Sequence, residues 1–310
     1  MRLQILVNHY REPEEVVARF LSSVAAQEHV PWGDVEVLVA SDGTELDWRF
    51  LSSFGIPITY WPREHEGVCR TRNFLMDEAD ADYLMLCDID DSFHSTLGLC
   101  KVLKAMDDVG TDVIAAPYDV EGDGPRYRMD KCDTVHVFGK AFRRMYLVEN
   151  GIRFPDDMTF SGDMHFLWLA FNLGGSVAWM RDSYYVWRRN PDSVTRRNPW
   201  HRVRTYPKVL RCYETTLDSL AERGRDDLHH VLVASLFAMA YVQSHDERFT
   251  EAPEEAVALM DVAIADFAMV HVAEYRALPE QLKAEALQGR RTTFGTVEGM
   301  DEWVETVCAR

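Results

Sequence analysis

Short apolar segments alternate with helix-like segments through the first half of the chain. Between the apolar segments, residues 13–26, 68–79 and 96–106 repeat apolar side chains at helical spacing. The strand-like apolar runs, most of them ending at polar or turn-forming residues, cover 3–7, 35–40, 56–61, 83–87 and 112–117. Strands this apolar are covered on both faces, so the pattern predicts an α/β fold with a Rossmann-like, mainly parallel sheet flanked by helices.

After about residue 200 the pattern changes. Residues 206–220, 226–243 and 254–275 carry helical periodicity and strand signals disappear, which predicts an α/β domain over 1–200 and an all-helical region over 201–310. We expect no membrane span, because no stretch approaches the roughly 18–20 apolar residues that one needs. The longest candidate, 231–242, is typical of a buried helix. The C-terminal helices offer a surface for homo-oligomerisation.

Polar clusters follow three of the predicted strands, at the point where each strand ends. They are Asn8-His9-Tyr10, Ser41-Asp42 and the segment from Asp88 to Asp91. In parallel sheets covered by helices, ligands bind beyond the carboxyl ends of the strands. We therefore expect these three clusters to share one rim of the sheet.

Asp88, Asp90 and Asp91 are the strongest chemical signal in the chain. Three carboxylates within four positions repel one another unless a positive charge lies between them. A hard divalent cation such as Mg²⁺ or Mn²⁺ takes oxygen ligands and bridges to phosphate oxygens, so the triplet predicts a metal site. The alternative is that one carboxylate caps the helix that begins near residue 96, but capping needs one carboxylate and not three.

Other polar residues gain meaning from their predicted positions. As a turn-forming residue Asp42 needs no further explanation, but its predicted position faces the acidic triplet. Arg70 and Arg72 enter the helix before the triplet, where an arginine can bind a diphosphate through two hydrogen bonds; ordinary surface arginines are the alternative. Asp163 heads an apolar helix, where it is either a first-turn aspartate or a general base.

The charge distribution limits the partners. A net charge of −18 disfavours binding to duplex nucleic acid. Residues 181–204 nevertheless hold seven arginines against two aspartates, which indicates either a localised anion or a basic surface that balances nearby carboxylates. The six cysteines are scattered, and the apolar run after Met1 is too short for a signal peptide, so we expect a cytoplasmic protein with reduced thiols.

An ordered series of motifs runs through residues 2–197. It comprises Asn8-His9-Tyr10, Asp42-Gly43-Thr44, Gly67 to Asn73, Asp88-Ile89-Asp90, Gly162-Asp163, Tyr185 to Arg188, and Ser193-Val194-Thr195. This series resembles the family 2 glycosyltransferases with a GT-A fold. Two positions depart from that pattern: Gly162 stands where a glutamate is usual, and Asn190 stands where a histidine often adds a metal or phosphate contact. Whether Asn190 or His201 supplies that contact is left open by the sequence.

The resemblance implies a metal-dependent transfer of sugar, with inversion, from a nucleoside-diphosphate donor to an acceptor hydroxyl. The donor is expected to be UDP-linked, and a glycan, a polymer, a protein or a modified base would be the acceptor. Asp163 would be the general base, and Asp90, with Asp88 and Asp91, would hold Mn²⁺ or Mg²⁺. The expected donor contacts are Asn8, Tyr10 and Asp42 near the nucleoside, Asp88 toward ribose or metal, and Arg72, Arg188 and Ser193 near the diphosphate.

Two other functions remain open at this point. Residues 84–92 also resemble the nucleophile loop of haloacid-dehalogenase-like phosphatases, which would use Asp88 and Asp90. That loop normally follows the first strand of its fold, whereas here three strand candidates precede it. The other alternative is a non-catalytic module that binds a nucleotide or a glycan.

Overall fold

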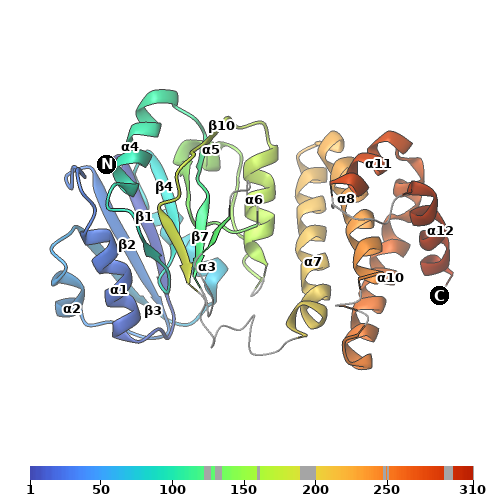
Figure 1. Ribbon diagram of the computed structural model, residues 1–310, viewed down its shortest axis with the longest axis horizontal. Coiled ribbons are helices and arrows are strands. Elements are labelled where there is room, and N and C mark those ends of the chain that lie inside the picture. The colour runs from blue at the N-terminus through green and yellow to red at the C-terminus, as the bar shows by residue number, and fades with distance from the viewer. Residues whose placement is uncertain are drawn as a thin grey trace. The chain divides into compact units, whose positions relative to one another are not determined.

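The computed structural model describes residues 1–121, 127–129, 135–158, 161–188, 200–246, 249, 251–289 and 296–309. The chain separates into two compact units, residues 1–190 and residues 191–310 (Figure 1). The sequence placed the boundary at residue 200, ten residues further along.

A mainly parallel sheet forms the centre of the first unit. Its order is β10-β6-β9-β4-β1-β2-β3, and β9 is antiparallel to both of its neighbours while the other pairs are parallel. The strands are β1 Leu3–His9, β2 Val35–Asp42, β3 Ile58–Arg63, β4 Tyr83–Asp88, β6 Val113–Ala115, β9 Lys140–Arg143 and β10 Val177–Trp179. The predicted fold class is confirmed, although the sequence did not predict β9.

Helices cover this sheet, and Figure 1 shows its strands standing between α1 and α6. The helices of the unit are α1 Glu14–Ala25, α2 Trp48–Ser52, α3 Val68–Glu78, α4 Gly98–Val109, α5 Arg144–Glu149 and α6 Gly162–Asn172. In α1, the apolar residues predicted from helical spacing form the buried face: Val17, Phe20, Leu21 and Val24 are fully buried. Burial of this apolar stripe against the strands is what holds the helix on the sheet.

A second, smaller sheet joins the acidic triplet to a distant part of the chain. Its order is β5-β11-β7-β8, with β5 Ser92–Phe93, β7 Tyr118–Glu121, β8 Tyr127–Met129 and β11 Tyr185–Arg188. β5 begins directly after Asp91, and Val186 of β11 lies opposite Ser92. This pairing brings Arg188 next to the triplet, 97 positions away from Asp91 in the sequence.

The strand register places the three polar clusters on one rim, as the sequence predicted. Asn8 lies opposite Asp88 on one side of β1, and His9 lies opposite Ser41 on the other. Adjacent strands are about 4.8 Å apart. Ser41-Asp42 at the end of β2 and the acidic triplet that begins at the end of β4 are therefore separated by roughly 10 Å across the sheet.

The second unit is helical throughout its described residues, 200–246, 249, 251–289 and 296–309. Its principal helices are α7 His201–Glu222, α8 Asp226–Ser244, α10 Glu254–Ala277, α11 Glu280–Gln288 and α12 Val297–Cys308. An aromatic cluster lies in its core. Phe237 of α8 lies 5.2 Å from Phe267 and 4.3 Å from Tyr275, both on α10, measured between ring centroids.

α10 corrects one expectation from the sequence. We expected no stretch to approach the length and apolarity of a membrane span, but within the described residues this one helix is long and apolar enough to cross a membrane. The scattered acidic residues of 254–277 had interrupted the apolar run that we looked for. Buried helices of other proteins meet the same two criteria, so length and composition give α10 no membrane role by themselves.

Candidate active site

A buried arginine connects the two halves of the predicted site. Arg72 on α3 is 5% exposed, and its Nη2 donates a 2.7 Å hydrogen bond to Oδ1 of Asp88 at the end of β4. Its Nη1 pairs with Oδ1 of Asp163 in the first turn of α6. Burial alone would lower the pKa of Arg72, but the charges of Asp163 and Asp88 outweigh it and raise that pKa, which keeps the guanidinium charged. Two predicted carboxylates thus meet around one predicted arginine.

The glycine before Asp163 has a steric explanation. A Cβ atom at Gly162 would overlap Sγ of Cys69, which fills the space beside α3. The chain therefore has no room for the glutamate that the resemblance led us to expect at this position. Burial first of all, reinforced by Asp163, raises the pKa of the Cys69 thiol to about 12, although Arg72 opposes the shift. Cys69 is therefore a protonated packing residue and not a nucleophile.

The acidic triplet divides into two partly exposed carboxylates and a buried one. Asp88 and Asp90 are partly exposed, whereas Asp91 is fully buried. Oδ1 of Asp91 accepts the backbone N–H of Arg188 at 2.8 Å, and its Oδ2 has no hydrogen-bond partner among the described residues. Burial, together with the charges of Asp88 and Asp90, raises the pKa of Asp91 well above its usual range. The helix-capping alternative is wrong, because α4 begins after Leu97 without a side-chain cap.

The donor set fits a magnesium-like or manganese-like cation that is completed by substrate. Within the described residues, no three His, Cys, Asp or Glu side chains converge as a ready-made metal cage. Such a cation is usually held by one or two carboxylates, with phosphate and water oxygens filling its other positions. Asp88 and Asp90 match this pattern. Asp91 stays a predicted ligand, although its side chain is turned toward Arg188.

Two arginines lie beside the triplet. Nη2 of Arg19, on α1, donates to the carbonyl oxygen of Asp90 at 2.6 Å. Nε of Arg188 donates to Oγ of Ser92 at 3.0 Å, and its Nη1 lies 3.1 Å from Glu121. Burial, and then the charge of Arg188, lowers the pKa of Arg19. The sequence predicted Arg188 but not Arg19, because nothing in the pattern of α1 indicates that this side chain reaches the loop after β4.

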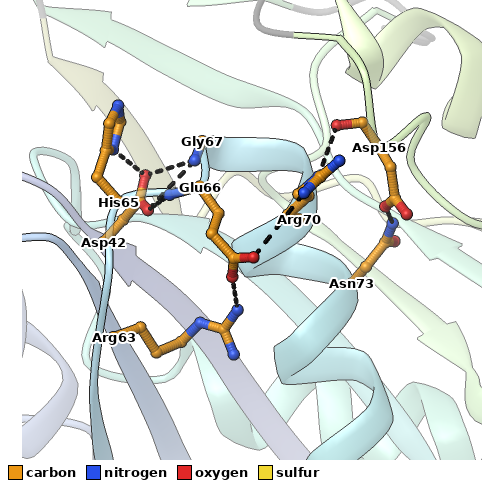
Figure 2. Close-up of polar contacts among 8 residues, drawn as sticks. All are labelled: Asp42, Arg63, His65, Glu66, Gly67, Arg70, Asn73 and Asp156. Carbon is orange, nitrogen blue, oxygen red and sulfur yellow. Dashed lines mark hydrogen bonds and ion pairs between the residues drawn. The ribbon is translucent and has the colours of Figure 1, made fainter.

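Asp42, the last residue of β2, contacts the loop that leads into α3 (Figure 2). Its Oδ1 accepts the backbone N–H of Glu66 at 2.7 Å, and its Oδ2 accepts the N–H of Gly67 at 3.1 Å. Oδ2 also lies 3.0 Å from Nδ1 of His65. Asp42 is 3% exposed, and these three hydrogen-bond partners all belong to residues 65–67.

Tyr10 lies against this loop. Its ring stacks on His65 with a centroid distance of 4.7 Å and an interplanar angle of 26°, and the guanidinium of Arg11 lies 4.7 Å from the Tyr10 ring centroid. Oδ1 of Asn8 is buried without a hydrogen-bond partner among the described residues. Sequence reasoning missed His65, because one histidine in a polar loop carries no pattern that distinguishes it.

The Arg-Asn pair at the end of the 67–73 motif has two separate functions. Arg72 bridges the carboxylates, while Asn73 anchors the segment before α6 (Figure 2). Nδ2 of Asn73 donates to the carbonyl of Phe154 and to Oδ1 of Asp156, each at 2.8 Å. Arg70 is half exposed and donates to the carbonyl of Asp156 at 3.2 Å, which matches the surface-arginine alternative.

Two predicted positions lie outside the described residues: Ser193, expected near the diphosphate, and Asn190, where a histidine is often found. His201 is the first residue of α7 in the second unit, and burial lowers its pKa.

Comparison with protein families gives one match that spans more than half of the chain. The sequence pattern described as glycosyl transferase family 2 matches residues 4–185. These residues include the three rim clusters, both arginines of α3 and Asp163. No curated protein matches the sequence significantly.

Solved structures share the fold at low sequence identity. TarS 1-349 of S. aureus in complex with UDP-GlcNAc is 17% identical with a TM-score of 0.73, and the match covers 100% of this chain and 88% of that one. TarS 1-349 in complex with UDP is 18% identical with a TM-score of 0.67, covering 99% and 90%. The mannosyltransferase PcManGT of Pyrobaculum calidifontis, in complex with GDP-Man and Mn²⁺, is 15% identical with a TM-score of 0.53, covering 99% and 84%. The fold is thus GT-A-like, with a helical C-terminal region.

Proposed function

The chain belongs to glycosyl transferase family 2, and from that premise we propose that it transfers a sugar from a nucleoside-diphosphate donor to an acceptor hydroxyl, with inversion at the anomeric carbon. The observation that carries this proposal is the Arg72 bridge between Asp88 and Asp163. A carboxylate of the donor-side motif and a candidate base face the same guanidinium. The reacting carbon would lie between such groups.

On the donor side, Asp88 and Asp90 would hold Mn²⁺ or Mg²⁺, with oxygens of the donor diphosphate completing its ligands. The TarS complexes with UDP-GlcNAc and UDP, and the PcManGT complex with GDP-Man and Mn²⁺, support a nucleotide-sugar donor, and we propose a uridine diphosphate sugar. When bound, the cation stabilises the negative charge that develops on the leaving diphosphate. Arg188 and Arg19, beside the triplet, add positive charge on that side.

On the acceptor side, Asp163 takes the proton of the attacking hydroxyl. The hydroxyl oxygen forms a bond to the anomeric carbon, the bond from that carbon to the diphosphate oxygen breaks, and its electron pair leaves with the diphosphate. Arg72 pairs with Asp163 and fixes the orientation of its carboxylate. The acceptor supplies a hydroxyl, and a glycan, another polymer, a protein or a modified base all meet that requirement.

The family match bears differently on the two alternatives, the phosphatase and the non-catalytic binding module. The phosphatase alternative is wrong, because the strand that leads into Asp88 and Asp90 lies within a family 2 domain and is preceded by three strands of the same sheet. The non-catalytic module is an alternative that turnover decides.

A donor panel tests the proposal. The purified protein is incubated with UDP-, GDP-, CDP- and ADP-sugars and Mn²⁺, with and without excess EDTA, and release of the nucleoside diphosphate is measured. We expect one donor to be hydrolysed or transferred, and EDTA to abolish the reaction. If no donor turns over while UDP binds with Mn²⁺, the non-catalytic alternative is correct.

A further inference from the structure

The surroundings of Asp42 differ from what the family resemblance led us to expect. The resemblance implies that Asp42 contacts the nucleoside of the donor. In the structure its carboxylate already accepts the backbone N–H groups of Glu66 and Gly67 and contacts the imidazole of His65 (Figure 2). Asp42 is 3% exposed, so its carboxylate presents almost no surface to a nucleobase.

The same contact fixes the hydrogen positions of His65. An ionised carboxylate accepts hydrogen bonds and donates none, so Nδ1 of His65 carries the hydrogen that Asp42 accepts at 3.0 Å. In the neutral imidazole, Nε2 then carries the lone pair. The His65 side chain is 56% exposed, which leaves an acceptor atom on the accessible side of the loop.

His65 is also held in position by its backbone surroundings. Gly43, the residue after Asp42, has φ +94°, and a Cβ atom there would lie 2.9 Å from Cβ of His65. The N–H of Gly43 donates to the carbonyl of Arg63 at 2.9 Å, two residues before His65. Two contacts to the ring itself set the orientation of the imidazole: the hydrogen bond with Asp42 and the stack on Tyr10.

We propose that His65, and not Asp42, reads the nucleobase of the donor, by accepting a ring N–H at Nε2. Asp42 is then a positioning residue that fixes the tautomer of His65, and Tyr10 is the platform that supports its ring. This inference rests on the proposed function, because it presumes that a nucleotide binds at this rim.

The chemistry of the acceptor atom defines a class of bases. Uracil and guanine carry a ring N–H at the edge used in base pairing, whereas the equivalent ring nitrogen of cytosine and adenine carries a lone pair. Two lone pairs facing each other repel. A fixed acceptor at Nε2 therefore selects uridine and guanosine nucleotides over cytidine and adenosine nucleotides.

The test is calorimetric titration of the chain with UDP, GDP, CDP and ADP in the presence of Mn²⁺, at about pH 8, where a free imidazole is neutral. We expect the preferred one of UDP and GDP to bind about tenfold more tightly than CDP and ADP, the size of one hydrogen bond. His65→Phe keeps a ring on Tyr10 but removes the acceptor, so we expect it to abolish this preference by weakening only the preferred nucleotide.

Asp42→Asn gives the sharper result. Its amide oxygen can still accept the backbone N–H groups, while its NH₂ group donates to Nδ1 of His65 and moves the ring hydrogen to Nε2. We expect the preference to shift toward CDP, and the ¹⁵N NMR signals of the imidazole to report the other tautomer. His230→Phe, an exposed histidine of the second unit, is the control and should keep the wild-type preference.

The outcomes distinguish failure of the proposed function from failure of the proposed role of His65. If no nucleotide binds to the wild type, both the proposed function and this inference fail. If nucleotides bind but His65→Phe keeps the wild-type preference, only the inference fails, and His65 is a structural part of the loop. Should Asp42→Asn not fold, as judged by circular dichroism, His65→Phe decides alone.

Discussion

The two units bury charge in different ways. Among the described residues, the first unit buries Asp42, Arg72, Asp91 and Lys140, and the first three lie at or beside the carboxyl ends of β2 and β4. Of the charged residues that the structure describes in the second unit, one is buried: Lys283, which pairs with an exposed glutamate and lies over the Tyr275 ring.

This difference shows that the chain tolerates the energetic cost of buried charge mainly in the first unit. A buried charge destabilises the fold unless it is paired and hydrogen-bonded, so a concentration of such groups needs a reason other than stability. In the first unit the reason is chemistry at the rim. The second unit is built mainly from apolar and aromatic contacts, which stabilise a scaffold without creating a reactive site.

The contrast between the two units would be wrong if the buried charges at the rim had only a structural role. Asp163→Asn removes the proposed base while leaving a side chain of the same size beside Arg72. We expect transfer to slow about 10²–10⁴-fold, because a positioned base contributes that much, while calorimetric affinity for UDP with Mn²⁺ stays close to that of the wild type. Asp107→Asn, an exposed aspartate, is the control. Wild-type turnover in Asp163→Asn would remove Asp163 from the mechanism.

A core substitution in the second unit tests the opposite expectation. Phe237→Ala opens a cavity beside Phe267 and Tyr275, and we expect it to lower the free energy of unfolding by about 3–5 kcal/mol. Below the unfolding transition, UDP affinity should be unchanged. Thermal unfolding and calorimetry measure the two quantities. A large loss of affinity in the folded variant would mean that the rim depends on this core.

Removing one buried cation from each unit tests the same contrast in a second way. Arg72→Met leaves two carboxylates facing each other at a largely buried position, and we expect a loss of about 3 kcal/mol of stability together with loss of transfer. Lys283→Met removes the partner of Glu280 and Asp301, whose side chains are 71% and 42% exposed, so its effect should stay within about 1 kcal/mol. Urea unfolding measures both. Equal losses would show that the two buried cations have the same role.

The smallest expected effect is the pH dependence of the second unit. Burial lowers the pKa of His271 below its ordinary 6.5; Glu274 opposes this shift and His229 adds to it. The unfolded chain therefore binds the proton more readily than the folded one. The stability that comes from neutral His271 is fully present above about pH 6.5 and is lost as the pH falls. We expect a loss of about 1 kcal/mol or less, measured by urea unfolding at pH 7.5 and pH 5.5. His271→Phe should flatten the difference, and an unchanged slope would contradict this origin.

Much of the fold could be predicted because periodicity is local. Apolar runs gave β1, β2, β3, β4 and β6, and helical spacing gave α1, α3 and the long helices of the second unit. Short elements such as β5, β9 and β11 were missed as strands, since two to four residues carry too little pattern. The antiparallel β9 is fixed by pairing with β4 and β6, which the sequence does not record.

The sequence by itself determined which strand ends carry polar residues, because the order of apolar and polar positions decides where a buried strand stops. It thereby placed Asp42, Asp88 and Asp90 on one rim. Only the tertiary structure decided what those residues contact: Arg72 meets Asp163 across 91 positions, Asp91 turns inward to Arg188, and Asp42 is occupied by His65 and its loop. The physical reason is that hydrogen bonds and ion pairs depend on distances of a few ångströms, which arise only once the chain has folded.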